Sequence, residues 1–368
     1  SFANARAVPL GYDAAPVIEV TMDFRGVDVG ENGRLVARER LLEVARALPG
    51  IEEASAVNSR LFATSTSDLR VDGIDSVAAL GRFNRQVASP PYFTVMRTRI
   101  LRGRAFDATD GPNAPPVVVV SAAMGAALWP GKDPLGQCIR IGIGGGIQPM
   151  ETAPCTTVIG IAEDAAQQNL GDDPRFMYYL PLDAYRGWPS STLYVRARGT
   201  SATAMLEPLR AALTRAMPGD GLVVVRPLQE VVDNQMKSWE LGATLFTALG
   251  GLAFVVAAVG LYGVISYGVA GRRHELGVRV ALGASARDVI TLVVRDGVVL
   301  ALTGSLIGVL LARAAARWVQ PLLFDQSAGD LRVHVAVGAA MLAVAVVASL
   351  LPARRASRAD PMQALRAE

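Results

Sequence analysis

The stretch LGATLFTALGGLAFVVAAVGLYGVISYGVAG, residues 241–271, holds 31 residues without one charged side chain. A helix needs only about 20 apolar residues to cross the roughly 30 Å hydrocarbon core of a membrane. The whole chain of 368 residues is also 51% hydrophobic, which is more apolar than an ordinary soluble enzyme. The sequence therefore predicts a first transmembrane helix over about residues 241–270.

Two further apolar segments follow the first. The last one is ended by Pro352 and two arginines, whose long side chains can place their charges at the membrane interface. The middle one, residues 297–312, reaches spanning length if residues 289–296 extend the helix. A buried amphipathic helix is the alternative for that middle segment. The sequence thus predicts an all-α membrane domain over residues 236–368, with three transmembrane helices at about 241–270, 289–312 and 334–353.

Arginine is distributed unequally over the connections between these spans. Residues 271–288 and the tail, residues 354–368, carry four arginines each, whereas residues 313–332 carry three. Short loops rich in Arg and Lys stay in the cytoplasm. We therefore expect a multi-pass protein of the bacterial cytoplasmic (inner) membrane, with a cytoplasmic loop 271–288, a cytoplasmic tail and a periplasmic N-terminal domain.

The first 235 residues are predicted to form an α+β domain. Residues 16–60 and 190–232 each contain an alternating strand, a helix with apolar side chains at helical spacing, a Pro-Gly stop and a second strand. Each is a βαβ-like unit. Residues 69–189 are rich in short strands, Pro and Gly, which predicts an inserted β-rich subdomain. Residues 228–233 begin a helix that can run continuously into the membrane.

The predicted cytoplasmic loop has a helical pattern. Glu275 precedes Arg279 by four residues, the favourable order for an ion pair on a helix face. Gly283 can end this helix, and Ser285 can cap the helix that follows. These residues predict a short helix on the membrane surface, and the alternative is a positively charged stop-transfer loop without a partner.

Glycine and cysteine residues carry two structural expectations. Small-residue faces, at Gly260 and Gly263 and at Gly304 and Gly308, allow membrane helices to approach closely. The only two cysteines, Cys138 and Cys155, lie in two predicted neighbouring strands joined by a glycine-rich segment. In an oxidising periplasm they are expected to form a disulfide, and the alternative is a pair of buried free thiols.

No catalytic, metal or nucleic-acid site is predicted. The segment PGKDP, residues 130–134, lacks the first glycine and the hydroxyl residue of a P-loop. His274 and His334 fall on opposite sides of the predicted membrane, which excludes a shared metal site. Basic residues are not interleaved with aromatic ones in a stripe. We therefore expect no enzyme activity and no cofactor bound by this chain.

Four segments of the chain resemble one family. GLYGVISYGVAGRRHELGVRVALGASARDV, residues 260–289, resembles the FtsX-like permease domain of ABC exporters of the MacB type, and LLPARRASRADPMQALRAE, residues 350–368, is similar to that family's C-terminal signature. VVVVSAAMGAALWPGKDPLGQCIRIG and TTVIGIAEDAAQQNLGDDPRFMYYLPL resemble two blocks of its periplasmic core domain. The likeness implies that the two βαβ-like units pair into one porter-like subdomain.

The likeness is strongest to duplicated orphan permeases described from acidobacteria, in which a core domain and a three-span unit occur twice. The chain begins SFANARAV, without Met. In the family a membrane helix precedes this point, so the chain is expected to be a C-terminal fragment.

The resemblance also implies a partner and a docking site. In this family a separate cytoplasmic ABC ATPase binds ATP and Mg²⁺ and docks on the loop between the first two spans. Carried over by position, the docking residues are Glu275, Leu276, Gly277, Arg279, Ala281, Leu282, Gly283 and Ala284, and Asp360, Pro361 and Arg366 of the tail share the contact.

The function implied is a permease subunit of an ABC-type exporter or mechanotransmission complex that carries out efflux. Further partners implied are the lipid bilayer, a second permease or the tandem duplicated half, and a periplasmic adaptor or outer-membrane channel. The alternative is a non-transporting regulator or scaffold that controls a periplasmic protein such as a cell-wall hydrolase.

Overall fold

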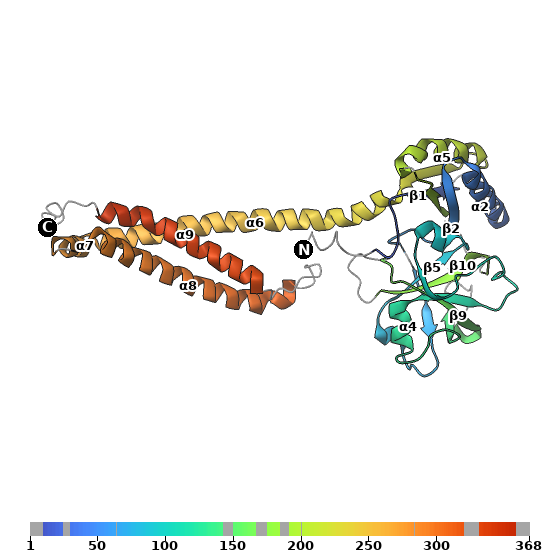
Figure 1. Ribbon diagram of the computed structural model, residues 1–368, viewed down its shortest axis with the longest axis horizontal. Helices are drawn as coiled ribbons and strands as arrows, with labels where there is room; N and C mark the ends of the chain where they lie inside the picture. The colour runs from blue at the N-terminus through green and yellow to red at the C-terminus, as the bar shows by residue number, and fades with distance from the viewer. Residues whose placement is uncertain are drawn as a thin grey trace. The chain divides into compact units, whose positions relative to one another are not determined.

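The computed structural model describes residues 10–24, 30–63, 65–142, 150–166, 175–184, 191–199, 201–282, 284–319 and 331–357. The chain divides into two compact units (Figure 1). The N-terminal unit is Ala5–Ser238, and the C-terminal unit is Trp239–Glu368 together with the first four residues. Each unit is described separately.

Two β-α-β segments, one near the start and one near the end of the N-terminal unit, form one part of its sheet. Their strands lie in the order β12-β1-β11-β2, and every neighbouring pair is antiparallel. β1 and β2 are consequently parallel to each other with β11 between them, which is a split βαβ arrangement. The elements are β1 (Val17–Asp23), α2 (Gly30–Ala47), β2 (Ile51–Val57), β11 (Thr192–Ala197), α5 (Ala202–Ala216) and β12 (Leu222–Pro227).

The alternation of the strands decides which face these helices cover. Ile18, Val20 and Met22 of β1 point to one face of the sheet because successive side chains of a strand point to opposite faces. They join Leu41 of α2 and Leu213 of α5 in a core from which water is almost excluded. Figure 1 shows α2 and α5 on this part of the sheet. Burial of these aliphatic side chains stabilises the layer by about 25 cal/mol per Å² of apolar surface.

The sheet continues into the middle of the chain through one narrow connection. Between β2 and β5 the described strand pair is Val57 with Ala88, flanked by backbone hydrogen bonds from Asn58 to Val87 and from Ser89 to Ala56. From β5 the order is β10-β7-β9-β8-β4, with β3 paired to β5 and β6 paired to β9. The elements are β3 (Ser65–Thr66), β4 (Asp68–Arg70), β5 (Phe83–Ala88), α3 (Tyr92–Met96), β6 (Ile100–Gly103), β7 (Val117–Ser121), α4 (Ala122–Leu128), β8 (Cys138–Gly142), β9 (Cys155–Ala162) and β10 (Phe176–Pro181).

An aromatic cluster supports this narrow connection. Tyr92 of α3 lies with its ring centroid 5.7 Å from Tyr179 of β10 and 6.5 Å from Tyr194 of β11. Arg196, also on β11, donates a hydrogen bond of 2.9 Å to the carbonyl oxygen of Val95 in α3. Burial raises the pKa of the Tyr179 and Tyr194 hydroxyls, so both rings stay neutral. α3 therefore joins the split βαβ strands to the strands inserted between them.

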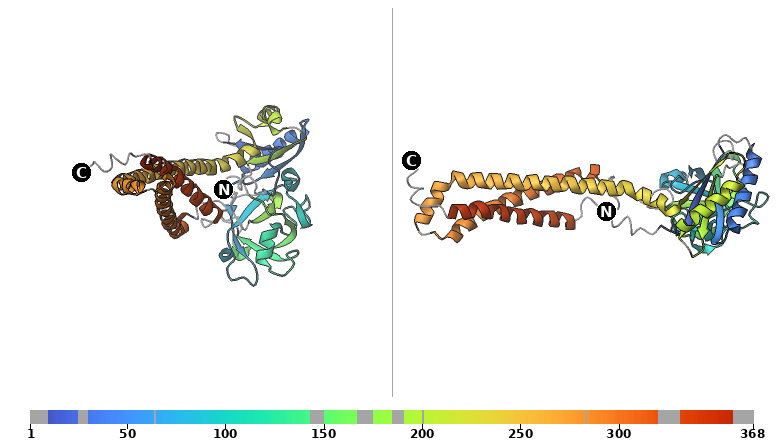
Figure 2. Two further views of the ribbon diagram at one scale, coloured as in Figure 1. Left: turned by 60° about the vertical axis from the view of Figure 1, so that its left-hand side comes forward. Right: turned by 90° about the horizontal axis from the view of Figure 1, so that it is seen from above.

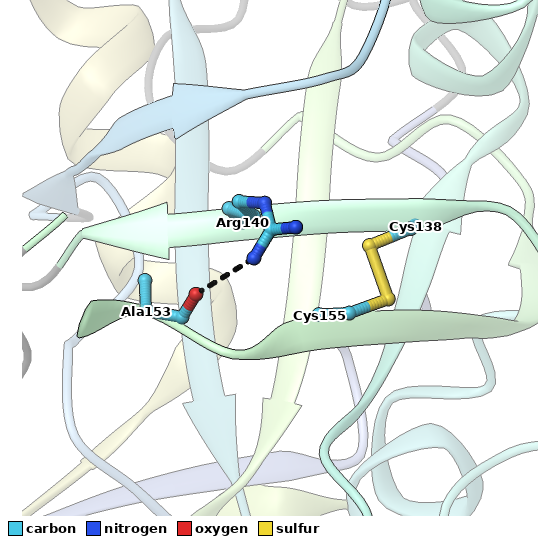
Figure 3. The surroundings of a disulfide bond; sticks show 4 residues. All are labelled: Cys138, Arg140, Ala153 and Cys155. Carbon is cyan, nitrogen blue, oxygen red and sulfur yellow. Dashed lines mark hydrogen bonds between the residues drawn. A yellow bond between two sulfur atoms is a disulfide. The ribbon is translucent and has the colours of Figure 1, made fainter. Parts of the chain in front are cut away.

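Cys138 and Cys155 are joined by a disulfide in the structure, with their Cα atoms 5.4 Å apart (Figure 3). β8 and β9 pair antiparallel, with Cys138 opposite Thr157 and Arg140 opposite Cys155. Beside the disulfide, Arg140 donates to the carbonyl oxygen of Ala153 at 3.3 Å. Residues 143–149, which join the two strands, lie outside the described residues.

Four helices follow β12: α6 (Leu228–Gly271), α7 (Arg273–Ala281), α8 (Ala286–Val319) and α9 (Leu331–Ser357). Among the described residues, two segments are long and apolar enough to cross a membrane, Thr244–Gly271 and Arg287–Ala315, and in each only 6% of the most apolar window is buried. Within the described part of the chain, the apolar window of α8 is therefore exposed rather than buried. The apolar stretch of α9, Val335–Leu350, is shorter than a full span, so the third crossing stays a prediction.

Among the described glycines of the C-terminal helices, Gly297 of α8 is the one at which a Cβ would meet neighbouring helices. A Cβ placed there would lie 2.3 Å from Ser349 Oγ of α9 and 3.1 Å from Ile265 Cδ1 of α6. Ser349 is fully buried and donates to the carbonyl oxygen of Ala345 at 2.6 Å. α8 and α9 pack against each other. In Figure 2 they are the orange and the red helix, respectively.

The glycines predicted to pack helices do not lie at contacts within this chain. A Cβ on Gly260, Gly263, Gly304 or Gly308 would have no heavy atom within 4 Å among the described surroundings. Residue spacing identifies a smooth helix face but not the direction in which that face turns, so packing through these glycines stays a prediction. All four glycines therefore leave smooth faces open on α6 and α8.

Removal of the disulfide is expected to destabilise the N-terminal unit. Replacing Cys138 and Cys155 together by Ser should lower its free energy of unfolding by about 3 kcal/mol, because the reduced chain gains conformational freedom in the unfolded state. Denaturant unfolding of the purified chain in detergent, followed by near-UV circular dichroism, measures this difference. With a reductant present, the two proteins should unfold at the same midpoint. Equal midpoints without the reductant would contradict the prediction.

The position of the helix contact can be tested with two matched substitutions on α8. Gly297→Leu should destabilise the C-terminal unit by about 1–3 kcal/mol, because the added side chain overlaps Ser349 and Ile265. Gly304→Leu adds the same volume to an open face and should leave the stability of the single chain nearly unchanged. Thermal denaturation in detergent compares the two variants, and equal losses would refute the assignment of the contact to Gly297.

Candidate functional site

The first turns of α6 are fixed within the N-terminal unit. Leu228, Val231 and Val232 are buried. Just before them, Arg226 at the end of β12 donates two hydrogen bonds, of 3.0 and 2.6 Å, to one carboxylate oxygen of Glu19. Glu19 lies fully buried on β1, the next strand of the sheet. The start of α6 is therefore anchored to the sheet by apolar packing and by a charge-assisted contact in which two guanidinium N–H groups share one carboxylate oxygen.

The other end of α6 leads into the short helix α7. α6 ends at Gly271, and α7 begins at Arg273 after a single residue. Leu276 is only 5% exposed. Glu275 and Arg279 lie on exposed surface and form an ion pair with 2.9 Å between the carboxylate oxygen and the guanidinium nitrogen. α7 thus combines one buried leucine with an exposed charged pair.

That ion pair adds little to the stability of the chain itself. Both side chains are about half exposed, and such pairs at i,i+4 on a helix contribute only about 0.3–0.5 kcal/mol. Because this exposed ion pair contributes so little free energy, its two charges can bind other partners at a small loss of stability. It is therefore suited to contact another protein, whereas Leu276 is occupied inside the unit.

Local hydrogen bonds define the junction between α7 and α8. The backbone N–H of Ala284 donates to the carbonyl oxygen of Arg279 at 3.0 Å, so the chain turns directly after α7. Ser285 then precedes α8, and its backbone N–H and hydroxyl both donate to Asp288, at 2.9 and 2.7 Å. This is the part of a capping box in which an acidic residue at the third helical position returns to the cap residue. α8 therefore begins at a defined residue.

The structure groups most of the sequence-predicted docking residues. Glu275, Leu276, Gly277, Arg279 and Ala281 lie on α7, and Leu282 and Ala284 lie in the turn after it. Leu282 is the most exposed large apolar residue of this group, at 83%. Gly283, Asp360, Pro361 and Arg366 lie outside the described residues. The turn and α7 together present one charged pair and one exposed leucine.

Sequence reasoning missed an ion pair and a cavity next to α7. Arg272, between α6 and α7, lies 3.3 Å from a carboxylate oxygen of Asp296 on α8. Beside this pair is a cavity of about 150 Å³, lined by apolar residues of α6 and α8 and by Leu276. The available signal was Asp296 itself, because a carboxylate within an apolar span requires a partner. The sequence did not identify that partner, since Arg272 is 24 residues away.

The described parts of the chain contain no group of three or more His, Cys, Asp or Glu side chains arranged to hold a metal ion. Tyr12, Tyr179 and Tyr194 are the titratable groups most strongly affected by burial, which raises the pKa of each hydroxyl. The rings of Tyr179 and Tyr194 pack against Tyr92 at the connection between the two parts of the sheet, and the Tyr12 hydroxyl donates to the carbonyl oxygen of Ala166 at 2.9 Å.

Two family models match consecutive parts of the chain. Residues 6–215, more than half of it, match the MacB-like periplasmic core domain, and residues 247–361 match the FtsX-like permease C-terminal model. Residues 216–246 separate the two matches, and the division between the two compact units, after Ser238, falls within this interval.

Named relatives and solved structures are similar to the chain over long segments. The macrolide export ATP-binding/permease protein MacB 1 of Aeromonas hydrophila is 26% identical over 94% of this chain and 52% of its own length. The probable syringafactin export ATP-binding/permease protein SyfD of Pseudomonas syringae is 25% identical over 75% and 42%, respectively. The chain thus spans about half the length, or less, of these two relatives.

Among solved structures, the periplasmic region of MacB from Actinobacillus actinomycetemcomitans aligns with 61% of this chain and 94% of its own, at 14% identity and a TM-score of 0.42. Both family matches agree with the order of the units, in which a mixed α/β part precedes apolar helices. The chain belongs to the MacB/FtsX-like family of ABC transporter permeases.

Proposed function

We propose that this chain is the membrane subunit of an ABC-type exporter or mechanotransmission complex, and that α7 is the element on which a separate cytoplasmic ATPase docks. The observation that carries the proposal is α7 itself, a charged helix that connects two helices of membrane-spanning length. Its exposed Glu275 and Arg279 supply opposite charges, and Leu276 fixes it to the membrane helices. Charges presented in this way give a docking surface register and selectivity.

In this proposal ATP and Mg²⁺ are bound by the partner. The relatives named above combine ATP-binding and permease parts in one protein, whereas this chain contains no P-loop. The docking surface consists of Glu275, Leu276, Gly277, Arg279, Ala281, Leu282, Gly283 and Ala284. Asp360, Pro361 and Arg366 of the tail share the contact, and Asp360 followed by Pro361 is the sequence pattern of a helix cap and a first-turn proline.

Movement imposed on α7 passes to the N-terminal unit through α6. This helix is continuous over 44 residues, from Leu228 to Gly271, and its first turns are anchored by buried residues and by the Arg226–Glu19 contact. Since each helical residue is tied to the next turn by a backbone hydrogen bond, displacement of one end is transmitted along the axis. The N-terminal unit lies in the periplasm, and α7 and the tail lie in the cytoplasm.

The complex proposed contains further members. A second permease, or the tandem half of a duplicated protein, packs against the open glycine faces of α6 and α8. A periplasmic adaptor or outer-membrane channel binds the N-terminal unit and completes the export path. Co-purification of such a channel from native membranes supports export, whereas co-purification of a cell-wall hydrolase supports the regulator that the sequence left as the alternative.

The docking surface can be tested by removing its charges. Glu275→Ala combined with Arg279→Ala should weaken binding of the co-purifying ATPase by about tenfold or more, because charges at a desolvated interface lose their partners. Its ATPase stimulation should fall with it. Binding and turnover are measured with the chain reconstituted in lipid vesicles.

The chain offers a matched control on α5. Glu207 and Arg210 form an exposed ion pair of 2.8 Å in the N-terminal unit. Glu207→Ala with Arg210→Ala removes the same charges and should leave ATPase binding unchanged. Unchanged stimulation in the α7 variant, or equal losses in both variants, would exclude docking on α7.

Orientation can be tested by cysteine labelling in intact cells with a permeable outer membrane. Thr214→Cys on α5 should react with a membrane-impermeant maleimide, because the N-terminal unit is periplasmic and this position is exposed. Ser285→Cys should react only after the inner membrane is opened. The native cysteines are bonded to each other and give no background. Reaction of both positions from the same side would contradict the proposed topology.

A further inference from the structure

Asp296 is a carboxylate inside a segment of membrane-spanning character. It lies in Arg287–Ala315, ten residues after the first residue of α8. At a rise of about 1.5 Å per residue, this places Asp296 roughly 15 Å along the helix axis from its start. Charged side chains within apolar helices are costly unless they are paired, and they commonly mark functional positions. The presence of Asp296 within this apolar helix therefore points to a specific partner.

The partner of Asp296 comes from the junction of α6 and α7. Arg272 is the single residue between these helices, and its Nη1 donates to Asp296 Oδ2 at 3.3 Å. Arg295, the neighbour of Asp296 in sequence, projects from α8 about 100° around the helix axis from Asp296. The pair consequently links three helices through two side chains.

Leu276 lies one helical turn beyond Arg272 and depends on the same junction. Its backbone N–H donates to the carbonyl oxygen of Arg272 at 3.0 Å, and its side chain enters the cavity that Arg272 and Asp296 border. Ile265 of α6 and Val293 of α8 line the same cavity and pack in one small apolar cluster. The cavity, of about 150 Å³, leaves space next to Leu276 for a small displacement of α7.

We propose that Arg272 and Asp296 form a latch that fixes the orientation of α7 against α8. Both are positioning residues, because they act through α7 and lie outside the docking surface itself. This inference rests on the proposed docking function of α7. With the latch closed, Leu276 is held in its cavity, and a force on α7 moves α6 and α8 together. With the latch open, α7 pivots and the force is lost.

The surroundings make this contact stronger than a surface ion pair. In the isolated chain Arg272 and Asp296 are 64% and 61% exposed, and in water such a pair is worth little. At the edge of a bilayer, lipid replaces part of that water, and the attraction between opposite charges grows as the local dielectric constant falls. The strength of the latch therefore depends on where Asp296 lies relative to the bilayer.

The first experiment measures α7 without the ATPase, so that latch and docking are tested separately. The full chain carrying Leu276→Cys is reconstituted in lipid vesicles with α7 outward, and its labelling rate with a water-soluble maleimide is recorded. Asp296→Asn and Arg272→Gln should each raise the rate about tenfold, because local opening controls the reactivity of a buried thiol. The charge swap, Arg272→Asp with Asp296→Arg, should restore the slow rate. Arg295→Gln is the control and should have no effect.

Several results would overturn the latch. An unchanged labelling rate in Asp296→Asn refutes it directly. If both single variants are labelled fast and the charge swap is also labelled fast, the two residues act separately and the latch is refuted. If the labelling rate changes with the fraction of anionic lipid in the vesicles but not with Asp296→Asn, the partner of Arg272 is a lipid phosphate instead. The charge swap also controls for folding, since a misfolded chain would remain fast and elute as an aggregate.

The second experiment uses Leu276 in its native form and adds the ATPase. Asp296→Asn should reduce ATPase stimulation at least fivefold while ATPase binding stays within about twofold, because the docking residues are untouched. Loss of binding together with stimulation would place Asp296 in the docking surface and refute the positioning role. If the Glu275 and Arg279 variant binds the ATPase normally but the labelling results hold, docking on α7 fails and the latch remains.

Discussion

Backbone hydrogen bonding in the absence of water is the constraint on which the rest of this structure depends. A chain that enters hydrocarbon must satisfy its N–H and C=O groups internally, and a helix does so residue by residue. α6 continues this solution for 44 residues, from the end of β12 to Gly271. One element therefore belongs to both compact units, and no loop interrupts the connection between the sheet and α7.

The two ends of α6 are held by different physical means. At its start, apolar packing of Leu228 and Val232 is reinforced by the contact of Arg226 with the buried Glu19. At its end, the attachment to α8 consists of a small apolar cluster, the Gly297 approach and the Arg272–Asp296 pair. The first end is set into a large core, whereas the second leaves a cavity beside Leu276. The two ends of α6 therefore differ in how tightly they are packed.

The N-terminal unit also combines a rigid part with a narrow connection. The split βαβ strands and the inserted strands share a sheet through the strand pair of Val57 with Ala88. Tyr92, packed between Tyr179 and Tyr194, supports that connection from α3. Within the inserted part, the disulfide of Cys138 and Cys155 holds β8 to β9. Tyr92 thus strengthens the unit where its sheet is least continuous, and the disulfide strengthens the inserted part.

The sequence alone determined the elements of this protein, because their periodicity and length follow from local geometry. Strands 51–57 and 192–197, the continuous helix after residue 228 and the short helix before Gly283 all correspond to patterns of polar and apolar residues. Glu275 and Arg279 could likewise be paired from their spacing. Only the tertiary structure decided that Gly297, rather than Gly304, meets another helix, that Tyr92 bridges two parts of the sheet, and that Arg272 reaches Asp296. These contacts join residues far apart in the chain, and a local pattern fixes which face a helix offers but not which neighbour it meets.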